Sequence, residues 1–236
     1  MADAAALPSP TSAPRQAARS QRLWEAMHPV CSHDLPSQVV ALQSLLQLFE
    51  WDEAEHFTEQ GREYYRRLQS IAGKTFAQVQ FLKEIVRLQR YVPERVQLAF
   101  ANLYEGIRAE TQQLFPESAW QWEVDWPVEC FRADRRLVQL GVVRLLRATC
   151  GAGHTSWLIR MQTAAHADHV EWSIGAHAQG PWTPTLAEAV LLEQRLARAL
   201  AQEYLAATDI ACHPNEGAAS AATAFSLVIP HRLPHG

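Results

Sequence analysis

The sequence predicts an α+β protein: an N-terminal helical hairpin followed by a sandwich of helices and mostly antiparallel strands. In residues 21–91 the apolar side chains recur every three or four positions, which is the spacing of an amphipathic helix. After Pro93, short segments rich in Trp, Val and Phe alternate with further helical stretches. Helices and strands mixed in this way are typical of the α+β class.

Composition excludes several classes of protein. The 236 residues are 48% hydrophobic with a formal net charge of -4, which suits one or two small cores. This charge gives no general attraction to nucleic acid or to a membrane surface, so neither is an expected partner. No apolar run approaches the roughly 20 residues of a membrane span, and the start lacks a secretion signal, so we expect a cytoplasmic protein. Four widely separated cysteines should be free thiols: Cys31, Cys130, Cys150 and Cys212.

We expect a disordered Ala-, Pro- and Ser-rich tail over residues 1–18 and a helical dimerisation domain over residues 19–91. The first helix of that domain has its apolar side chains at Val39, Leu42, Leu45, Leu46 and Phe49. A second helix, from about residue 52 to 90, carries a near-heptad seam at Tyr64, Leu68, Ile71, Phe76, Val79, Leu82, Ile85 and Leu88. Since a lone helix of this length is marginal, a homodimeric four-helix bundle is expected. The alternative is a hairpin that packs within the monomer.

Residues 92–236 should form the second domain. Helical spacing covers residues 94–114, and strand-like segments at 119–124 and 128–132 flank Pro127. Asp134 is placed to cap a helix that runs to about Cys150. The remaining pattern predicts strands at 156–163 and 169–174, a helix at 185–206 and a strand at 223–229.

The stretch Cys31-Ser32-His33-Asp34-Leu35-Pro36-Ser37-Gln38 carries the chemistry that we expect. A carboxylate beside an imidazole can hold the ring in one tautomer and take up its proton, so His33 suits a nucleophile and Asp34 its helper. On a helix Asp34 and Gln38 share a face, so Gln38 can orient a water molecule or an aspartyl phosphate. Pro36 either lies in the first turn of a helix capped by Asp34 or kinks a helix that already includes His33.

Ser32-His33-Asp34-Leu35, followed by an apolar helix, a turn and a long second helix, resembles the H-box and dimerisation hairpin of two-component sensor histidine kinases. Further along, the helix at residues 94–114, a hairpin around Pro127 and then Asp134-Arg135-Arg136-Leu137-Val138-Gln139 resemble the approach to the N-box of these kinases. The resemblance covers about residues 20–230. It implies a dimerisation and phosphoacceptor hairpin joined to a Bergerat-type ATPase sandwich.

The chain departs from this family at the nucleotide site. Where the family has asparagines that hold Mg²⁺ and the ATP phosphates, this chain has Val143-Arg144-Leu145-Leu146-Arg147-Ala148-Thr149, and a guanidinium such as that of Arg144 cannot ligate a metal. The strand after Val170 lacks the acid of the Asp-x-Gly-x-Gly loop, and Pro181-Trp182-Thr183-Pro184 replaces a glycine-rich lid. We therefore expect a degenerate ATPase domain with no ATP binding, no autokinase activity and no cofactor.

The H-box also departs from its usual form. Most members have a proline five residues after the histidine, whereas this chain has Pro36 at three and Gln38 at five. The spacing Asp34-x-x-x-Gln38 resembles the phosphatase motif of another histidine-kinase subgroup.

The combination resembles bacterial histidine phosphotransferases that keep a decayed kinase domain. It implies that His33, with Asp34 and Gln38, accepts a phosphoryl group from one response-regulator receiver domain and donates it to another, with Mg²⁺ supplied by the receiver. The alternative is a non-catalytic pseudokinase scaffold or phosphatase-like regulator that binds a kinase or response regulator. An active kinase with an aberrant nucleotide site is a third reading.

Other motifs predict no site. The pairs His166/His169 and Cys150/His154 fall short of the four ligands of a structural zinc site. No Gly-x-Ser-x-Gly elbow accompanies Ser32, so serine hydrolase chemistry is not expected. Most tryptophans lie in predicted strands and should pack in the core.

Overall fold

The computed structural model describes residues 28–53, 55–150, 156–179, 188–214 and 222–230. The chain divides into two compact units, Met1–Arg90 and Tyr91–Gly236. The tail expected over residues 1–18 lies outside the described residues. Among the helices of the described residues, none has the length and apolar character needed to cross a membrane.

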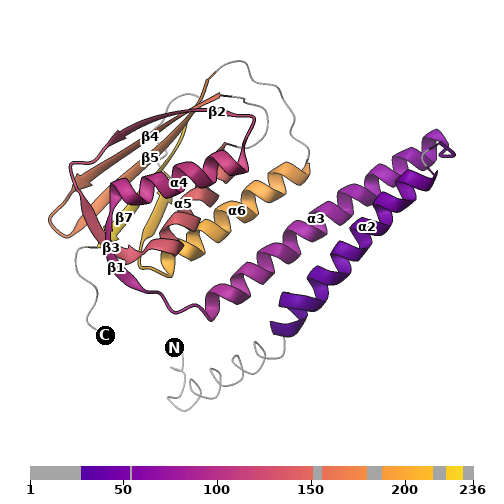
Figure 1. Ribbon diagram of the computed structural model, residues 1–236, viewed down its shortest axis with the longest axis horizontal. Coiled ribbons are helices and arrows are strands. Elements are labelled where there is room, and N and C mark those ends of the chain that lie inside the picture. The colour runs from indigo at the N-terminus through magenta and orange to yellow at the C-terminus, as the bar shows by residue number, and fades with distance from the viewer. Residues whose placement is uncertain (1–27, 54, 151–155, 180–187, 215–221, 231–236) are drawn as a thin grey trace, which may run out of the picture. The chain divides into compact units, whose positions relative to one another are not determined.

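The first unit is a hairpin of two long helices (Figure 1). A π-helical turn, η1 (Val30–Asp34), continues directly into α2 (Leu35–Glu53), and α3 (Glu59–Gln89) returns alongside it. The side chain of Thr58 accepts a hydrogen bond from the backbone N–H of Gly61 at 3.1 Å, which caps the start of α3. Residues 52 and 53, expected in the second helix, instead end the first.

The face of α3 that packs against α2 is a heptad seam. Tyr65, Ala72, Val79 and Val86 are only 3–6% exposed and recur every seven residues. The hydroxyl of Tyr65 donates to the carbonyl oxygen of Leu46 in α2 at 2.8 Å, which fixes the register of the two helices.

Most of the seam expected from the sequence lies beside this buried face. Val79 is the member that is buried, while others are 41–61% exposed: Tyr64, Leu68, Ile71 and Leu82. Two apolar stripes therefore run along α3. One contacts α2 and the other faces outward.

The second unit is a layer of helices on one face of a mixed sheet (Figure 1). The helices are α4 (Phe100–Leu114), α5 (Arg135–Thr149) and α6 (Glu188–Ala206). The strands are β1 (Arg95–Ala99), β2 (Ala119–Asp125), β3 (Cys130–Asp134), β4 (Ser156–Ala165), β5 (His169–Gln179), β6 (Ala211–Pro214) and β7 (Ala222–Pro230). The main sheet has the order β2-β4-β5-β7-β6, and β1 and β3 form a separate pair. Only β2 and β4 run parallel among the described neighbours. The expected α+β architecture is confirmed.

The core lies between the main sheet and the three helices. Along β5 every second residue is buried, with Val170, Trp172, Ile174 and Ala176 at 0–2% exposure. The ring of Trp172 meets that of Phe100 at the start of α4 edge to face, with 5.2 Å between centroids. Apolar residues at every second position of β5 therefore give the strand one face that packs in the core.

Three details differ from the sequence prediction. Residues 95–99, expected in a helix, form strand β1 because β3 offers a backbone partner 35 residues further along, with Ala133 opposite Val96 and Phe131 opposite Leu98. The strands around Pro127 do not form a hairpin, since β2 pairs with β4 and β3 with β1. The short edge strand β6 was not expected.

Candidate functional site

His33 lies within a continuous helix, in the π-helical turn that precedes Pro36. The backbone N–H of Leu35 bonds to the carbonyl oxygen of Val30, which closes the wider π turn. Proline has no N–H, and in a regular α-helix its ring would meet the carbonyl group four residues earlier, which belongs to Ser32. The wide turn accommodates that ring. Of the two placements left open by the sequence, the helix that already includes His33 is the one observed.

The imidazole of His33 is exposed and paired with its neighbour. Its side chain is 81% exposed and that of Asp34 56%, and 3.0 Å separates Nδ1 of His33 from Oδ1 of Asp34. An ionised carboxylate can only accept a hydrogen bond, so this contact requires the proton on Nδ1, and in the neutral imidazole the lone pair is then on Nε2. The pair therefore presents a ring nitrogen with nucleophilic character to the solvent.

Buried neighbours orient this turn. Cys31, Pro36 and Val39 are buried, so the opposite side of the turn faces outward. The hydroxyl of Ser32 donates a hydrogen bond to the backbone carbonyl oxygen of His28 at 2.5 Å. Its proton is therefore directed to the preceding helical turn and not to the imidazole of His33. These contacts hold His33 on the exposed side.

Gln38 is exposed one helical turn after Asp34. Among the described residues its carboxamide makes no hydrogen bond to His33 or Asp34. The structure thus places Gln38 within one turn of the pair without joining it to them. A role for Gln38 remains a prediction.

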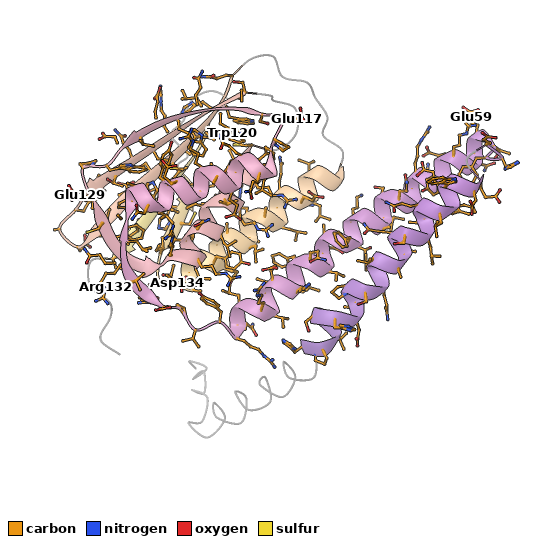
Figure 2. The ribbon with its side chains drawn as sticks, viewed as in Figure 1. Glu59, Glu117, Trp120, Glu129, Arg132 and Asp134 are labelled. Atoms are coloured by element: carbon orange, nitrogen blue, oxygen red, sulfur yellow. The ribbon has the colours of Figure 1, made fainter. Side chains whose placement is uncertain are left out.

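The helix compared with the kinase N-box is α5, and its N-cap residue is Asp134. Asp134, labelled in Figure 2, is 2% exposed and accepts hydrogen bonds from the backbone N–H groups of Leu137 at 3.0 Å and Glu94 at 2.7 Å. The hydroxyl of Tyr91 donates to the same carboxylate at 3.0 Å. The cap expected at Asp134 is present, and it also holds the segment that enters the second unit.

The positions of the missing asparagines on α5 carry side chains with other roles. Val143 is 2% exposed and belongs to the hydrophobic core. Arg147 forms an ion pair with Glu193 of α6, with 3.4 Å between its Nη2 and the carboxylate. Arg144 is half-buried. Neither valine nor arginine can donate a lone pair to a metal ion.

The stretch compared with the glycine loop is part of a regular strand. β5 continues to Gln179, and its backbone stays in register with β4 to that residue and with β7 as far as His177. At Gly175 an added Cβ would lie 3.3 Å from Nε2 of His177, so this ring lies over the glycine. The described part of the stretch therefore holds no loop that could enclose a nucleotide. Residues 181–184 lie outside the described residues.

The other candidate residues have structural partners. The rings of His166 and His169 stack at 4.5 Å, and each histidine pairs with a carboxylate, that of Glu171 at 3.3 Å and that of Asp168 at 2.7 Å. In the described ranges, no three His, Cys, Asp or Glu side chains gather as a metal site. His154, the expected partner of Cys150, lies outside those ranges.

A pocket that the sequence did not indicate lies between α4 and α5. It measures about 480 Å³ and is lined by Glu110, Arg135, Arg136, Gln139 and Leu140. Glu110 and Gln139 are 29 positions apart in sequence, and a hydrogen bond of 3.0 Å joins their side chains. Their spacing in the sequence does not predict this contact.

Comparison by sequence finds no matching family model and no matching curated protein. Comparison of structures does find matches. Acinetobacter baumannii histidine kinase AdeS aligns with a TM-score of 0.57 at 12% identity, over 86% of this chain and 99% of AdeS. Full-length ShkA in complex with AMPPNP aligns with a TM-score of 0.55 at 15% identity, over 89% of this chain. The chain spans about half of ShkA, 47% of its length. The chain therefore has the fold of the sensor histidine kinases, with a helical hairpin followed by an ATPase-type domain.

Proposed function

We propose that this chain is a histidine phosphotransfer protein of a two-component phosphorelay. His33 accepts a phosphoryl group from the aspartate of one response-regulator receiver domain and donates it to the aspartate of another. The observation that carries the proposal is the exposed His33–Asp34 pair at the head of the hairpin, with 3.0 Å between Nδ1 and Oδ1. The kinase-like fold around the pair supports it.

The transfer step follows from the tautomer of His33. The lone pair on Nε2 attacks the phosphorus atom of the aspartyl phosphate, an N–P bond forms, and the P–O bond to the receiver breaks. The electron pair of that bond returns to the receiver carboxylate. The Nδ1 proton stays hydrogen-bonded to Asp34, whose negative charge offsets the positive charge that develops on the ring. Mg²⁺ held by the receiver neutralises the phosphoryl oxygens. The reverse step loads the second receiver.

The proposal includes no use of ATP by this chain. The buried Val143 on α5 and the unbroken strand β5 support this part, because each stands where the kinases have nucleotide-binding groups. The second unit would serve as a docking surface and as a brace for the dimer.

Gln38 adds a second activity within the same proposal. An exposed carboxamide one turn from Asp34 is placed to orient a water molecule against a docked aspartyl phosphate, which would give phosphatase action. Receivers would dock on the exposed side of η1 and α2.

A scaffold that binds a kinase or a receiver without chemistry is the second candidate. The altered α5 and β5 are equally consistent with a scaffold and with a phosphotransfer protein. The scaffold differs because it needs no reactive histidine. What favours it is that Val143 and Arg147 are built into packing and ion pairing, as expected of a domain kept for its surface. The two candidates separate at His33.

The test is transfer of labelled phosphate from a panel of phosphorylated receivers to the purified protein. His33→Ala removes the acceptor. His56→Ala is the matched control, because His56 is also exposed (76%) and lies 3.6 Å from a carboxylate, that of Glu53. We expect label on the wild type and on His56→Ala but not on His33→Ala. Label retained by His33→Ala would refute the proposal, and no label from any donor would favour the scaffold. Label from ATP alone would indicate an active kinase.

A further inference from the structure

The pocket between α4 and α5 has the size and lining of a site for a small polar ligand. Its volume of about 480 Å³ lies within the range of small-molecule sites, roughly 300–1,000 Å³. Four of its five lining side chains are polar or charged, and Leu140 is the apolar one. Among the described residues no aromatic ring lines the pocket, so recognition there depends on charge and hydrogen bonds rather than on stacking.

Two guanidinium groups give the pocket its charge. Arg135 donates to the backbone carbonyl oxygen of Asn102 at 3.5 Å, and neither Arg135 nor Arg136 forms an ion pair with a carboxylate among the described residues. Guanidinium groups present planar sets of N–H donors that match phosphate and carboxylate oxygens. The donors of Arg136 and most of those of Arg135 thus remain available to a ligand.

Glu110 brings one negative charge into the same lining, where its carboxylate accepts a hydrogen bond from Gln139 at 3.0 Å, so the two arginines leave the described lining with a net positive charge. Gly106, one turn before Glu110 on α4, makes this contact possible. A Cβ at Gly106 would lie 2.7 Å from Oε1 of Gln139, so the glycine lets Gln139 lie across α4 without shifting its carboxamide. The packing of the two helices therefore fixes the carboxylate of Glu110 against Gln139.

The pocket is separate from the region compared with the kinase nucleotide site. Its residues on α5 lie between Arg135 and Leu140, at the start of the helix, whereas further along Val143 is buried in the core and Arg147 pairs with Glu193 of α6. The N-terminus of α5 is not the anion site, because its cap residue Asp134 already accepts a hydrogen bond from the backbone N–H of Leu137. Arginine side chains supply the positive charge.

We propose that this pocket binds a small organic anion through its phosphate or carboxylate group, with Arg135 and Arg136 as the binding residues and Gln139 as a positioned wall. The site needs no His33 and does not depend on the phosphotransfer proposal. A kinase-like unit without the usual nucleotide groups would in this way respond to a different ligand, bound near the start of α5.

The test is calorimetric titration of the full chain with two probes, pyrophosphate and citrate. Arg135→Ala/Arg136→Ala removes the guanidinium pair, and Arg87→Ala/Arg90→Ala removes two exposed arginines of the hairpin as a charge-matched control. We expect saturable binding to the wild type and the control, and a loss of about tenfold or more in the pocket variant, because hydrogen bonds to charged groups are lost. The probe that binds more tightly identifies the anionic group.

Two results would overturn the proposal: no saturable binding of either probe up to millimolar concentration, or equal weakening in the control. A second measurement on the wild type does not depend on the folding of any variant. The backbone amide NMR signals of Arg136, Gln139 and Leu140 should shift on titration with the bound probe. Shifts confined to residues away from these three would likewise contradict the site.

Discussion

The pair formed by His33 and Asp34 is a feature of two adjacent residues, and both are exposed. Its geometry depends on the helix only through the outward direction of the turn, which the buried Cys31 and Pro36 set. A pair of this kind on a protein surface is often no more than a local hydrogen bond. Chemistry at His33 is therefore best tested by changing the neighbour and keeping the ring.

Asp34→Asn should slow phosphotransfer through His33 without abolishing it. The amide is nearly isosteric with the carboxylate but carries no charge to offset the developing positive charge on the ring, so we expect the rate to fall about 10²-fold. Single-turnover transfer from a phosphorylated receiver measures this rate. Ser37→Ala, an exposed change in the next turn, should leave it unchanged. An unchanged rate in Asp34→Asn would mean that the pair is a surface contact only.

The four cysteines should react with iodoacetamide in a defined order. Cys130 is exposed, whereas burial raises the pKa of the Cys212 thiol to about 11 and also raises the pKa of Cys150. Cys31 is 3% exposed. Since the thiolate is the nucleophile, at about pH 8 we expect Cys130 to react first, Cys212 slowly, and the two buried thiols only after unfolding.

Mass spectrometry of the alkylated peptides over time gives this order. Raising the pH toward the pKa of Cys212, about 11, should accelerate the alkylation of this thiol. Early modification of Cys150 in the folded protein would contradict its buried position.

At the scale of elements, two helical glycines, Gly73 and Gly141, differ in whether the packing around them has room for a side chain. At Gly73 in α3 an added Cβ would meet nothing within 4 Å. At Gly141 in α5 it would lie 2.8 Å from Cγ of Leu205, a residue of α6 with 0% exposure. The first glycine is dispensable to packing, and the second sets how closely α5 and α6 approach.

Gly73→Ala should raise the free energy of unfolding by about 0.5–1 kcal/mol, because alanine is the better helix former. Gly141→Ala should lower it, since overpacking a core costs about 1–3 kcal/mol and outweighs the same gain in propensity. Urea unfolding followed by circular dichroism measures both. Shifts in the same direction for the two variants would show that Leu205 yields to the added methyl group.

The local sequence predicts the helices of this protein more accurately than its strands. α5 was predicted because its signals are local: Asp134 as a cap, then a regular apolar spacing. β1 was assigned to a helix and β6 was missed, because strand formation requires a partner that the local sequence does not reveal. β5 was predicted too short, since its small residues Gly175, Ala176 and Ala178 give a weak strand signal although β4 and β7 pair with them.

At the scale of the whole molecule, the hairpin carries an apolar stripe that α2 and α3 do not bury between them. On α2 the exposed side chains include Leu42 at 46%, Leu45 at 64% and Phe49 at 49%, and on α3 they include Leu68 at 53% and Ile71 at 61%. Fully burying one such side chain stabilises an assembly by roughly 1.5–3 kcal/mol. A homodimer through this stripe remains a prediction that the stripe supports.

Light scattering of the full chain should give twice the chain mass, and Leu45→Glu/Ile71→Glu should give the monomer, because two charges per chain would be desolvated in the interface. Ser70→Glu is the control. Ser70 is exposed and lies about 100° around α3 from Ile71, so a charge there should not disturb the dimer. A monomeric wild type would favour the hairpin that packs within one chain.

The sequence by itself determined the fold class, the long helices, the buried alternation of β5 and the adjacency of His33 and Asp34. These follow from short-range spacing and from neighbours in the chain. Tertiary structure decided which stripe of α3 meets α2, with Tyr65 rather than Tyr64 inside, and the wide turn that places His33 in the helix before Pro36. It also decided the partner of each strand and the pocket of Glu110, Arg135 and Gln139. Contacts between residues far apart in the chain depend on how whole elements pack, and that packing leaves no local trace in the sequence.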